Sequence, residues 1–456
     1  MKTTTTKALL ILFIVLFSAA KLFAQEDSVT YRVILIGDAG ELKNEKNSVV
    51  DAVRKKFDLN NNKTTVIYLG DNIYPKGMPD EESSDYEESK NIITYQASLG
   101  LQSSAKIIFI PGNHDWDQGN PDGWERIQRE QRFIDSLDVS NIEFLPKDGC
   151  PGPEEINLND KLVLIVMDSQ WWLHQYNKPG ISSDCDCKTK DEVLSRIEEI
   201  VYRNRNKIIL FATHHPFRSY GIHGGYYTLK QHIFPFTDAN KSLYIPLPII
   251  GSIYPISRGV FGNIQDIPHP AYKQMISSVE ASLHQYPNVI HVSGHDHELQ
   301  LIKDSSFYYI VSGAGSKESR VKEGSKSLFS SKNYGYTVLE LKKDNVLYST
   351  FYAMADSASS EQLYSSGLIQ TPQQEILSTT ATTNNLPDSV YTNASSQYDK
   401  AGGLKRFLLG NNYRKEWNDS LNFKVFNIAS EKGGLKILQR GGGHQTKSLR
   451  LEDKAS

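Results

Sequence analysis

The chain has 456 residues, of which 39% are hydrophobic and 23% charged. This is a globular composition with room for about two or three domains, and it excludes collagen-like, coiled-coil and wholly disordered chains. The 50 Lys and Arg residues against 53 Asp and Glu residues give a net charge of -3. Because there is no overall basic footprint, we expect no nucleic-acid partner.

The N-terminus predicts a secretory signal peptide over residues 1–24. Lys2 and Lys7 precede an apolar run at 8–20, and the small residue Ala24 precedes a polar, charged segment. A basic start, a short apolar run and a small residue at the cut site are typical of such peptides. An uncleaved membrane anchor is the alternative, but the run is shorter than the ~20 residues of a spanning helix. We expect a secreted, periplasmic or cell-envelope protein.

Residues 28–355 predict one α/β domain. Short apolar runs rich in Val, Ile and Tyr are typical of buried strands, and they alternate with amphipathic stretches of helix length. This alternation predicts sheets flanked by helices. The predicted strands are 31–36, 64–69, 106–110, 162–167, 207–211, 289–292 and 307–311, followed by a hairpin at 334–341 and 345–352, and the predicted helices include 46–59, 124–137, 191–204 and 271–284.

Three further segments differ in composition. Residues 356–399 are rich in Ser, Thr and Asn, which predicts a linker. Residues 400–456 carry 12 Lys and Arg against 5 Asp and Glu, so this Gly-rich extension is either a solvated basic tail or a segment that associates with a membrane surface. The insertion at 226–270 contains prolines that exclude a spanning helix, and is either an ordered loop or a lid.

Cysteine usage leaves the pairing open. The chain has three cysteines, Cys150, Cys185 and Cys187, and export exposes them to oxidising conditions. Cys150 can pair with either of the other two, which leaves an odd thiol. A soft-metal site at the Cys-x-Cys segment is the alternative, but no second Cys or His pair lies nearby to complete it.

Five polar clusters each directly follow a predicted strand. The carboxyl ends of neighbouring strands in an α/β fold meet at one rim, so side chains far apart in sequence converge there. Carboxylates, amides and imidazoles suit hard and borderline metal ions. One such cluster alone is ordinary, since Gly-Asp is usually a turn, but five together predict a metal site. They are Gly37-Asp38-Ala39-Gly40, Gly70-Asp71-Asn72-Ile73-Tyr74, Gly112-Asn113-His114-Asp115, Thr213-His214-His215-Pro216 and Gly294-His295-Asp296-His297.

This set of motifs resembles the calcineurin-like metallophosphoesterase superfamily, and within it the small, tartrate-resistant type of purple acid phosphatase. The resemblance covers about residues 30–355. Many members of the superfamily have Asp-x-His as the first motif, whereas this chain has Gly40 in the third position and offers Tyr74 three residues after Asp71. The resemblance implies a two-sheet β-sandwich core flanked by helices, with a C-terminal extension.

The resemblance also implies roles for individual residues. His214, rather than His215, is the expected ligand because the family's ligand lies two residues before the proline. His114 and His223 match histidines that lie beside the substrate, and we expect them to donate protons. Asp71 is expected to bridge two ions. The implied ligands are Asp38, Asp71, Tyr74 and His297 for a first metal, ferric iron, and Asp71, Asn113, His214 and His295 for a second ion, Fe(II), Zn or Mn.

The implied activity is hydrolysis of phosphomonoesters by a water that the two cations activate. A phosphodiesterase, or a hydrolase directed at phospholipids or nucleotides, is an alternative because the same metal pair serves diesters. A third hypothesis is a membrane-associated module whose phosphatase domain presents a partner. The physiological ester, the second metal and the oligomeric state stay open.

Overall fold

The computed structural model describes residues 29–226, 233–234, 243–247 and 262–372, together with short strands further on. The predicted signal peptide, most of the insertion and the predicted linker beyond residue 372 lie outside the described residues. The chain divides into two units, Met1–Gln374 and Glu375–Ser456. Among the residues described, no helix combines the length and apolar character needed to cross a membrane.

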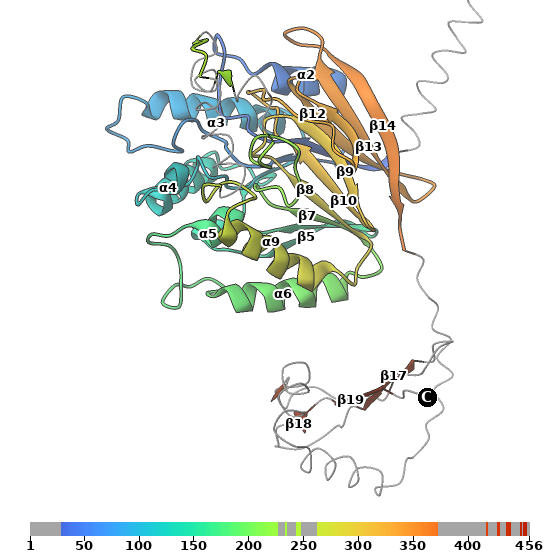
Figure 1. Ribbon diagram of the computed structural model, residues 1–456. Coiled ribbons are helices and arrows are strands. Elements are labelled where there is room, and N and C mark those ends of the chain that lie inside the picture. Colours follow the sequence, from blue (N-terminus) through green and yellow to red (C-terminus); the bar gives the residue numbers. More distant parts are fainter. Residues whose placement is uncertain are drawn as a thin grey trace, which may run out of the picture. The chain divides into compact units, whose positions relative to one another are not determined.

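The first unit contains two seven-stranded sheets (Figure 1). In spatial order, the first sheet consists of β14 (Ser360–Gln370), β13 (Val346–Met354), β12 (Gly335–Lys342), β1 (Val29–Ile36), β2 (Thr64–Tyr68), β3 (Lys106–Phe109) and β4 (Ile142–Phe144). The second consists of β11 (Ser327–Ser331), β9 (Leu299–Asp304), β10 (Phe307–Ser312), β8 (Val289–Ser293), β7 (Ile208–Ala212), β6 (Leu162–Val166) and β5 (Glu154–Asn159).

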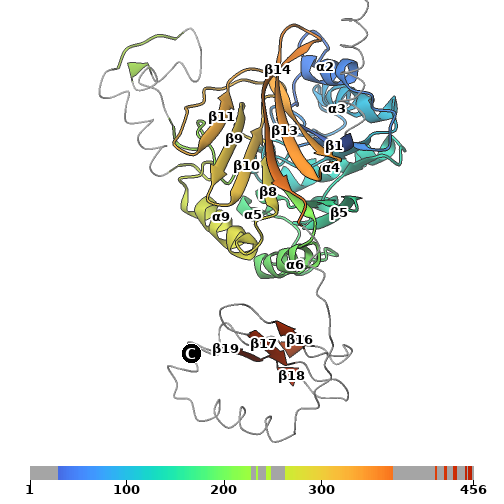
Figure 2. The ribbon, with the colours of Figure 1, turned by 90° about the vertical axis from the view of Figure 1, so that its right-hand side faces the viewer.

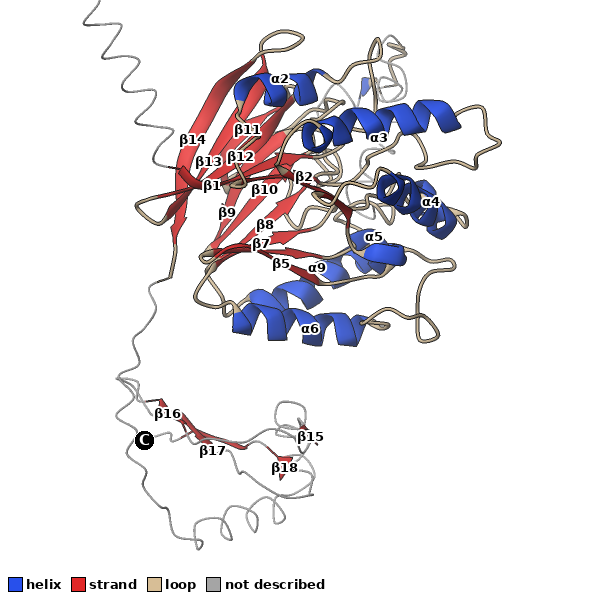
Figure 3. Cartoon of the chain, turned by 180° about the vertical axis from the view of Figure 1, so that it is seen from behind, coloured by secondary structure: helices blue, strands red, loops and turns tan. Residues whose placement is uncertain are grey.

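Helices cover the outer faces of the strand layers. In Figure 3, α2, α3 and α4 lie on the side of the first sheet, and α5, α6 and α9 lie on the side of the second. The helices are α2 (Ser48–Lys56), α3 (Tyr86–Leu101), α4 (Gly123–Ser136), α5 (Ser169–Leu173), α6 (Lys190–Arg203) and α9 (Pro270–Leu283), with short 3-10 turns at Asp117–Gly119 and Lys147–Gly149. The predicted α/β class, with two sheets flanked by helices, is confirmed.

The central strands are buried on both faces. In β1, Val33 and Leu35 belong to an apolar cluster that joins the two sheets, whereas Ile34 and Ile36 pack in a cluster that includes helix residues. Successive side chains of a strand point to opposite faces. Double burial therefore explains the uninterrupted apolar runs of the sequence.

The chain directions bring the motif-bearing strand ends together. β1, β2 and β3 run parallel to one another in the first sheet, and β7 and β8 run parallel in the second. These five strands are those that the polar clusters follow. Each sheet thus presents the carboxyl ends of its motif-bearing strands at one edge, where ligands bind in open α/β sheets.

The first sheet extends further than the composition indicates. β14 lies inside the segment 356–399 that is predicted to be a linker, and it pairs antiparallel with β13 along its length. Figure 2 shows β13 and β14 side by side on the face turned to the viewer. Most side chains of this edge strand are exposed or half-buried, and Leu368 is buried. A strand with little buried surface needs few apolar residues, so its Ser-rich sequence resembles a linker.

A disulfide joins Cys150 to Cys185, and Cys187 is a buried free thiol. Of the two pairings that the sequence leaves open, the structure has the one with the nearer cysteine. Because Cys185 is oxidised, the alternative of a Cys-x-Cys metal site is wrong.

In the second unit, the described residues form short antiparallel strands. β16 (Phe426–Ile428), β17 (Leu435–Leu438) and β19 (Arg450–Asp453) form one sheet, and β15 (Glu416–Trp417) pairs with β18 (Lys447–Ser448). The Gly-rich extension thus contains β-structure.

Candidate metal centre

Several residues at the strand exits have unusual backbone conformations. Asp38 has a φ of 59°, Asp71 of 54° and His295 of 70°. Left-handed conformations cost free energy for residues other than glycine, and they cluster at functional sites. The turns at the ends of β1, β2 and β8 are thus shaped to aim these side chains inward.

Gly40 explains how Tyr74 reaches the site. A Cβ atom at position 40 would lie 2.6 Å from the carbonyl oxygen of Asp71 and 2.7 Å from the backbone nitrogen of Ile73. The amide N–H groups of Gly40 and Tyr74 donate to Asp71 O at 3.0 Å and to Gly40 O at 2.9 Å. A side chain at position 40 would therefore collide with the loop that carries Tyr74. Gly40 thus takes the place of the histidine in the Asp-x-His motif, and its lack of a side chain leaves space for Tyr74.

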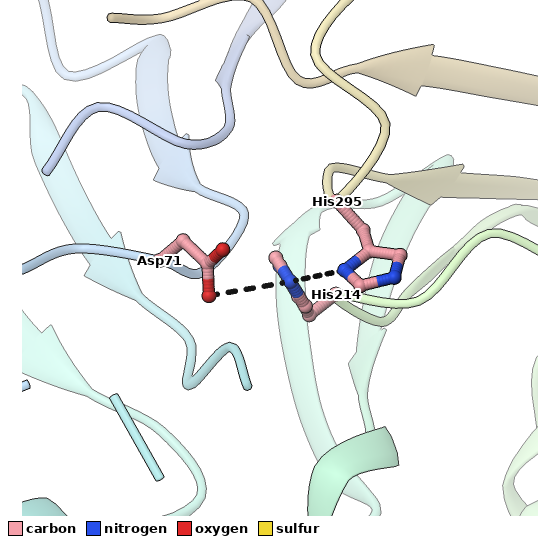
Figure 4. A group of neighbouring side chains, drawn as sticks. All are labelled: Asp71, His214 and His295. Atoms are coloured by element: carbon pink, nitrogen blue, oxygen red, sulfur yellow. Dashed lines mark hydrogen bonds and ion pairs between the residues drawn. The ribbon is translucent and has the colours of Figure 1, made fainter. Parts of the chain in front are cut away.

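Asp71, Asn113, His214 and His295 form one set of candidate metal ligands, here called the imidazole group, of which Figure 4 draws Asp71, His214 and His295. His214 Nε2 lies 2.9 Å from Asn113 Oδ1, 3.1 Å from His295 Nδ1 and 3.3 Å from Asp71 Oδ1. His295 Nδ1 lies 2.9 Å from Asn113 Oδ1. Neighbouring ligands of one ion, with bonds of about 2.1 Å, lie at roughly such separations.

The hydrogen bonds on the far side of each ring fix the tautomers of the imidazole group. His214 Nδ1 donates to Leu69 O at 2.8 Å, and His295 Nε2 donates to Gln265 O at 2.8 Å. The ring nitrogens that face the group are therefore bare acceptors. They face an amide oxygen and a carboxylate oxygen, also acceptors, with no proton to share. A cation satisfies such a set, and carbonyl partners of this kind orient metal-binding histidines.

Asp38, Asp71, Tyr74 and His297 form a second set, here called the phenol group. Tyr74 Oη lies 3.0 Å from Asp38 Oδ1, 3.1 Å from Asp71 Oδ2 and 3.2 Å from His297 Nε2. His297 Nε2 lies 3.4 Å from Asp38 Oδ1. Asp71 belongs to both groups, with one oxygen toward each, which is the arrangement of a bridging ligand.

Burial opposes ionisation of the acids in the phenol group. It raises the pKa of Asp38 to about 8, against the lowering effect of His214. At Asp71 burial acts in the same direction, but the electrostatic influence of His214 and His114 outweighs it and holds the pKa below its usual range. Burial, with Asp38 and Asp71 adding to it, raises the pKa of Tyr74. Three acids so close together need added positive charge to ionise together, so the residues present fit bound cations.

His114 borders the site beside the phenol group. Its backbone N–H donates to Asp71 Oδ1 at 2.9 Å and its Nδ1 donates to Pro75 O at 2.6 Å, which leaves Nε2 at 3.9 Å from Asp71 Oδ2. Burial lowers the pKa of His114 from its usual value. The imidazole is thus oriented with one nitrogen toward the shared carboxylate.

His223 borders the site beside the imidazole group. Its ring centroid lies 3.9 Å from that of His295, and its Nδ1 donates to Asp266 Oδ1 at 2.8 Å. Its backbone N–H donates to Asp296 Oδ1 at 3.0 Å, which ties the His223 loop to the loop of His295 and His297.

His215 takes no part in either group. Its ring nitrogens lie 2.8 Å from Ser169 Oγ and 2.6 Å from Gln265 Oε1. His214 therefore fits the ligand set, and His215 supports the surrounding structure.

Sequence reasoning missed three residues of the site. Asp266, in the insertion, orients His223. Asp115 accepts from the backbone N–H groups of Gly112, Asn72 and Ile73 at 2.7 to 3.1 Å, and so joins the loops after β2 and β3. The ammonium of Lys317 lies over the Tyr74 ring. Asp115 stands inside a polar cluster, which was a usable signal, whereas the other two have no motif.

The amino-acid sequence matches a known family model, that of the calcineurin-like phosphoesterases, over residues 31–299. The chain belongs to this family. Members are metal-dependent phosphoesterases, and the two Asp/His groups lie within the matched region. The family and these groups together support a binuclear metal centre in this calcineurin-like phosphoesterase and a phosphoester as its substrate.

Solved structures give distant matches, and a search of curated proteins gives none. GAP50, the anchor in the inner membrane complex of Plasmodium, has 17% identity and a TM-score of 0.48 over 76% of this chain and 90% of its own. A purple acid phosphatase from yellow lupin seeds has 12% identity and a TM-score of 0.43 over 74% of this chain and 53% of its own. PhoD has 11% identity and a TM-score of 0.45 over 76% and 70%.

Proposed function

We propose that the protein is a purple acid phosphatase-like phosphomonoesterase with Fe(III) in the phenol group and Fe(II), Zn or Mn in the imidazole group. The contact of Tyr74 Oη with Asp38 Oδ1, Asp71 Oδ2 and His297 Nε2 carries this proposal. Two carboxylates and a phenol oxygen favour a hard, highly charged ion, whereas two imidazoles and an amide suit a divalent one.

The ligand residues position the cations and the substrate. Two bound cations neutralise charge on the phosphoryl group and lower the pKa of a water. Asp71 fixes the spacing of the two sites because one carboxylate serves both groups. The carbonyls of Leu69 and Gln265 accept from the far ring nitrogens of His214 and His295, so each ring already presents its other nitrogen to the imidazole group.

His223 and His114 are the proposed proton donors to the leaving oxygen. Asp266 is buried and accepts from His223 Nδ1, so it orients the ring with Nε2 as the nitrogen left to face a substrate. Pro75 O orients His114 in the same way, although a carbonyl is a weaker partner than a carboxylate. We therefore assign the principal donor role to His223.

A matched pair of esters tests the proposal. 4-Nitrophenyl phosphate and bis(4-nitrophenyl) phosphate share a leaving group and differ in charge. We expect a higher kcat/KM for the monoester, and a visible absorption band from the Tyr74–iron bond. If the diester is the better substrate, the phosphodiesterase alternative holds; if the purified protein is colourless and iron-free, the assignment of the metal is wrong.

We also propose that the protein is exported. The predicted signal peptide at 1–24 motivates this, and the Cys150–Cys185 disulfide supports it because disulfides persist in oxidising compartments. N-terminal sequencing of protein from the native cell tests it: a mature chain that begins near Gln25 is the expected result, and an intact N-terminus in a cytoplasmic fraction contradicts it.

A further inference from the structure

The loop after β10 holds Lys317 beside the phenol group. Ser316 Oγ donates to Asp38 O at 2.6 Å, and the backbone N–H of Ser319 donates to His297 O at 2.8 Å. Gly315 N donates to Gly37 O at 2.9 Å. The loop is thus fastened, on either side of Lys317, to the backbones of two residues of the phenol group.

The Lys317 ammonium lies against the aromatic face of Tyr74. Its Nζ atom is 3.2 Å from the ring centroid, the shortest cation–ring distance in the described part of the chain. Because Tyr74 Oη contacts both carboxylates of the phenol group, an ammonium over this ring lies next to the metal centre. Lys317 is half-buried, so part of the side chain reaches solvent.

Within residues 29–226 and 262–372, no hydrogen bond or ion pair joins the Lys317 ammonium to a carboxylate, and its close contact is the Tyr74 ring. An ammonium has three N–H donors on a flexible stem, and it binds anionic oxygens as a compact charge. A contact with an aromatic face occupies none of these donors fully. The side chain therefore keeps the capacity to bind an anion that enters the site.

The two classes of phosphoester differ in what they offer such a cation. A phosphomonoester dianion has three terminal oxygens, whereas a phosphodiester monoanion has two. If each of two metal ions bound one terminal oxygen of a monoester and the histidine faced its ester oxygen, one terminal oxygen would stay free for a further donor. A fixed positive charge at that point discriminates by charge as well as by hydrogen bonding.

We propose that Lys317 binds a terminal oxygen of the substrate's phosphoryl group and sets the preference for phosphomonoesters over phosphodiesters. This rests on the phosphatase activity proposed above and gives it a specificity-determining residue that no motif indicates.

Lys317→Met tests the proposal because methionine keeps an apolar stem over the Tyr74 ring and removes the charge. We expect kcat/KM for 4-nitrophenyl phosphate to fall about 10-fold and that for bis(4-nitrophenyl) phosphate to stay within about 2-fold, as for loss of one charged hydrogen bond. Lys317→Arg restores most of the preference. Lys342→Met in β12, which removes an ammonium 4.1 Å from the Tyr348 ring in β13, is the matched control and changes neither value.

A binding measurement separates this proposal from the proposed activity. Calorimetry of the metal-loaded protein compares phenylphosphonate, as a dianion, with its monoanionic methyl ester. Lys317→Met weakens dianion binding about 10-fold and spares the monoanion. Equal losses for both probes, or for both esters at unchanged metal content, overturn the role of Lys317. If the wild-type protein hydrolyses neither ester, the proposed activity fails, and the calorimetry still decides what Lys317 binds.

Discussion

The phenol group and the imidazole group share Asp71 but hold their ions by different means. The imidazole group is closed, since His214 is 0% and His295 2% exposed, yet apart from Asp71 its donors are neutral. In the phenol group the His297 side chain is 24% exposed, but Asp38 and Tyr74 add ionisable oxygens. Anionic ligands attract a cation more strongly than neutral ligands do, and we expect this difference to exceed the effect of burying the neutral ligands. We therefore expect the more open group to hold its ion more tightly.

Asp71→Asn has the largest expected effect because it removes the one carboxylate that serves both groups. Loss of a residue that merely orients a ligand costs 10- to 100-fold in metal affinity or activity, so we expect turnover to fall by more than about 1000-fold. Elemental analysis and the rate with 4-nitrophenyl phosphate check this together. A variant that keeps both ions and full turnover removes Asp71 from the site.

Asp38→Asn and His295→Ala test the metal affinities of the two groups separately, because Asp38 belongs only to the phenol group and His295 only to the imidazole group. We expect His295→Ala to keep about one ion per chain after dialysis, held by the anionic phenol group, and Asp38→Asn to lose the ion of that group. Both variants lose turnover. The reverse pattern of retained metal would mean that burial, rather than ligand charge, decides affinity.

His223→Ala tests the proposal that His223 donates a proton to the leaving oxygen. General acids typically contribute 10²- to 10⁴-fold, so we expect roughly a 100-fold loss with an alkyl phosphate, whose leaving group needs a proton, and less than about 10-fold with 4-nitrophenyl phosphate. His284→Ala is the matched control, because that histidine is exposed at the end of α9. The same loss with both esters would argue against proton donation.

His291 provides a buried histidine outside both groups. Burial, with Arg218 adding to it, lowers the pKa of His291 to about 3, whereas an unfolded chain has a histidine pKa near 6.5. The folded state therefore loses stability as pH falls from about 6.5 toward 3, and none of this loss occurs above it. Relative to His291→Phe, the wild-type free energy of unfolding should drop by roughly 2 kcal/mol between pH 7 and 5. Urea unfolding at each pH measures it, and parallel pH curves contradict it.

The sequence predicts the fold class and the convergence of the strand exits well because both depend on strong local signals. Runs such as Ile34 to Ile36 indicate doubly buried strands, and the connection rule for such strands places their ends at one edge. The polar clusters that follow these strands identify the residues that meet at this edge, with Tyr74 as the candidate ligand where Gly40 offers none.

The residues that sequence reasoning missed act through long-range contacts. Asp266 lies 43 positions from His223, and Lys317 lies beside Tyr74 only because its loop is fastened to Asp38 and His297. No spacing rule connects such pairs. The edge strand β14 was not predicted for a different reason, because an exposed strand carries little apolar pattern.

Metal content measured together with turnover tests the central claim most directly. The purified protein should contain two ions per chain, lose its phosphatase activity on exhaustive chelation, and regain it when iron and a divalent ion are returned. Full turnover in a chelated, metal-free sample would contradict the binuclear centre on which the account rests.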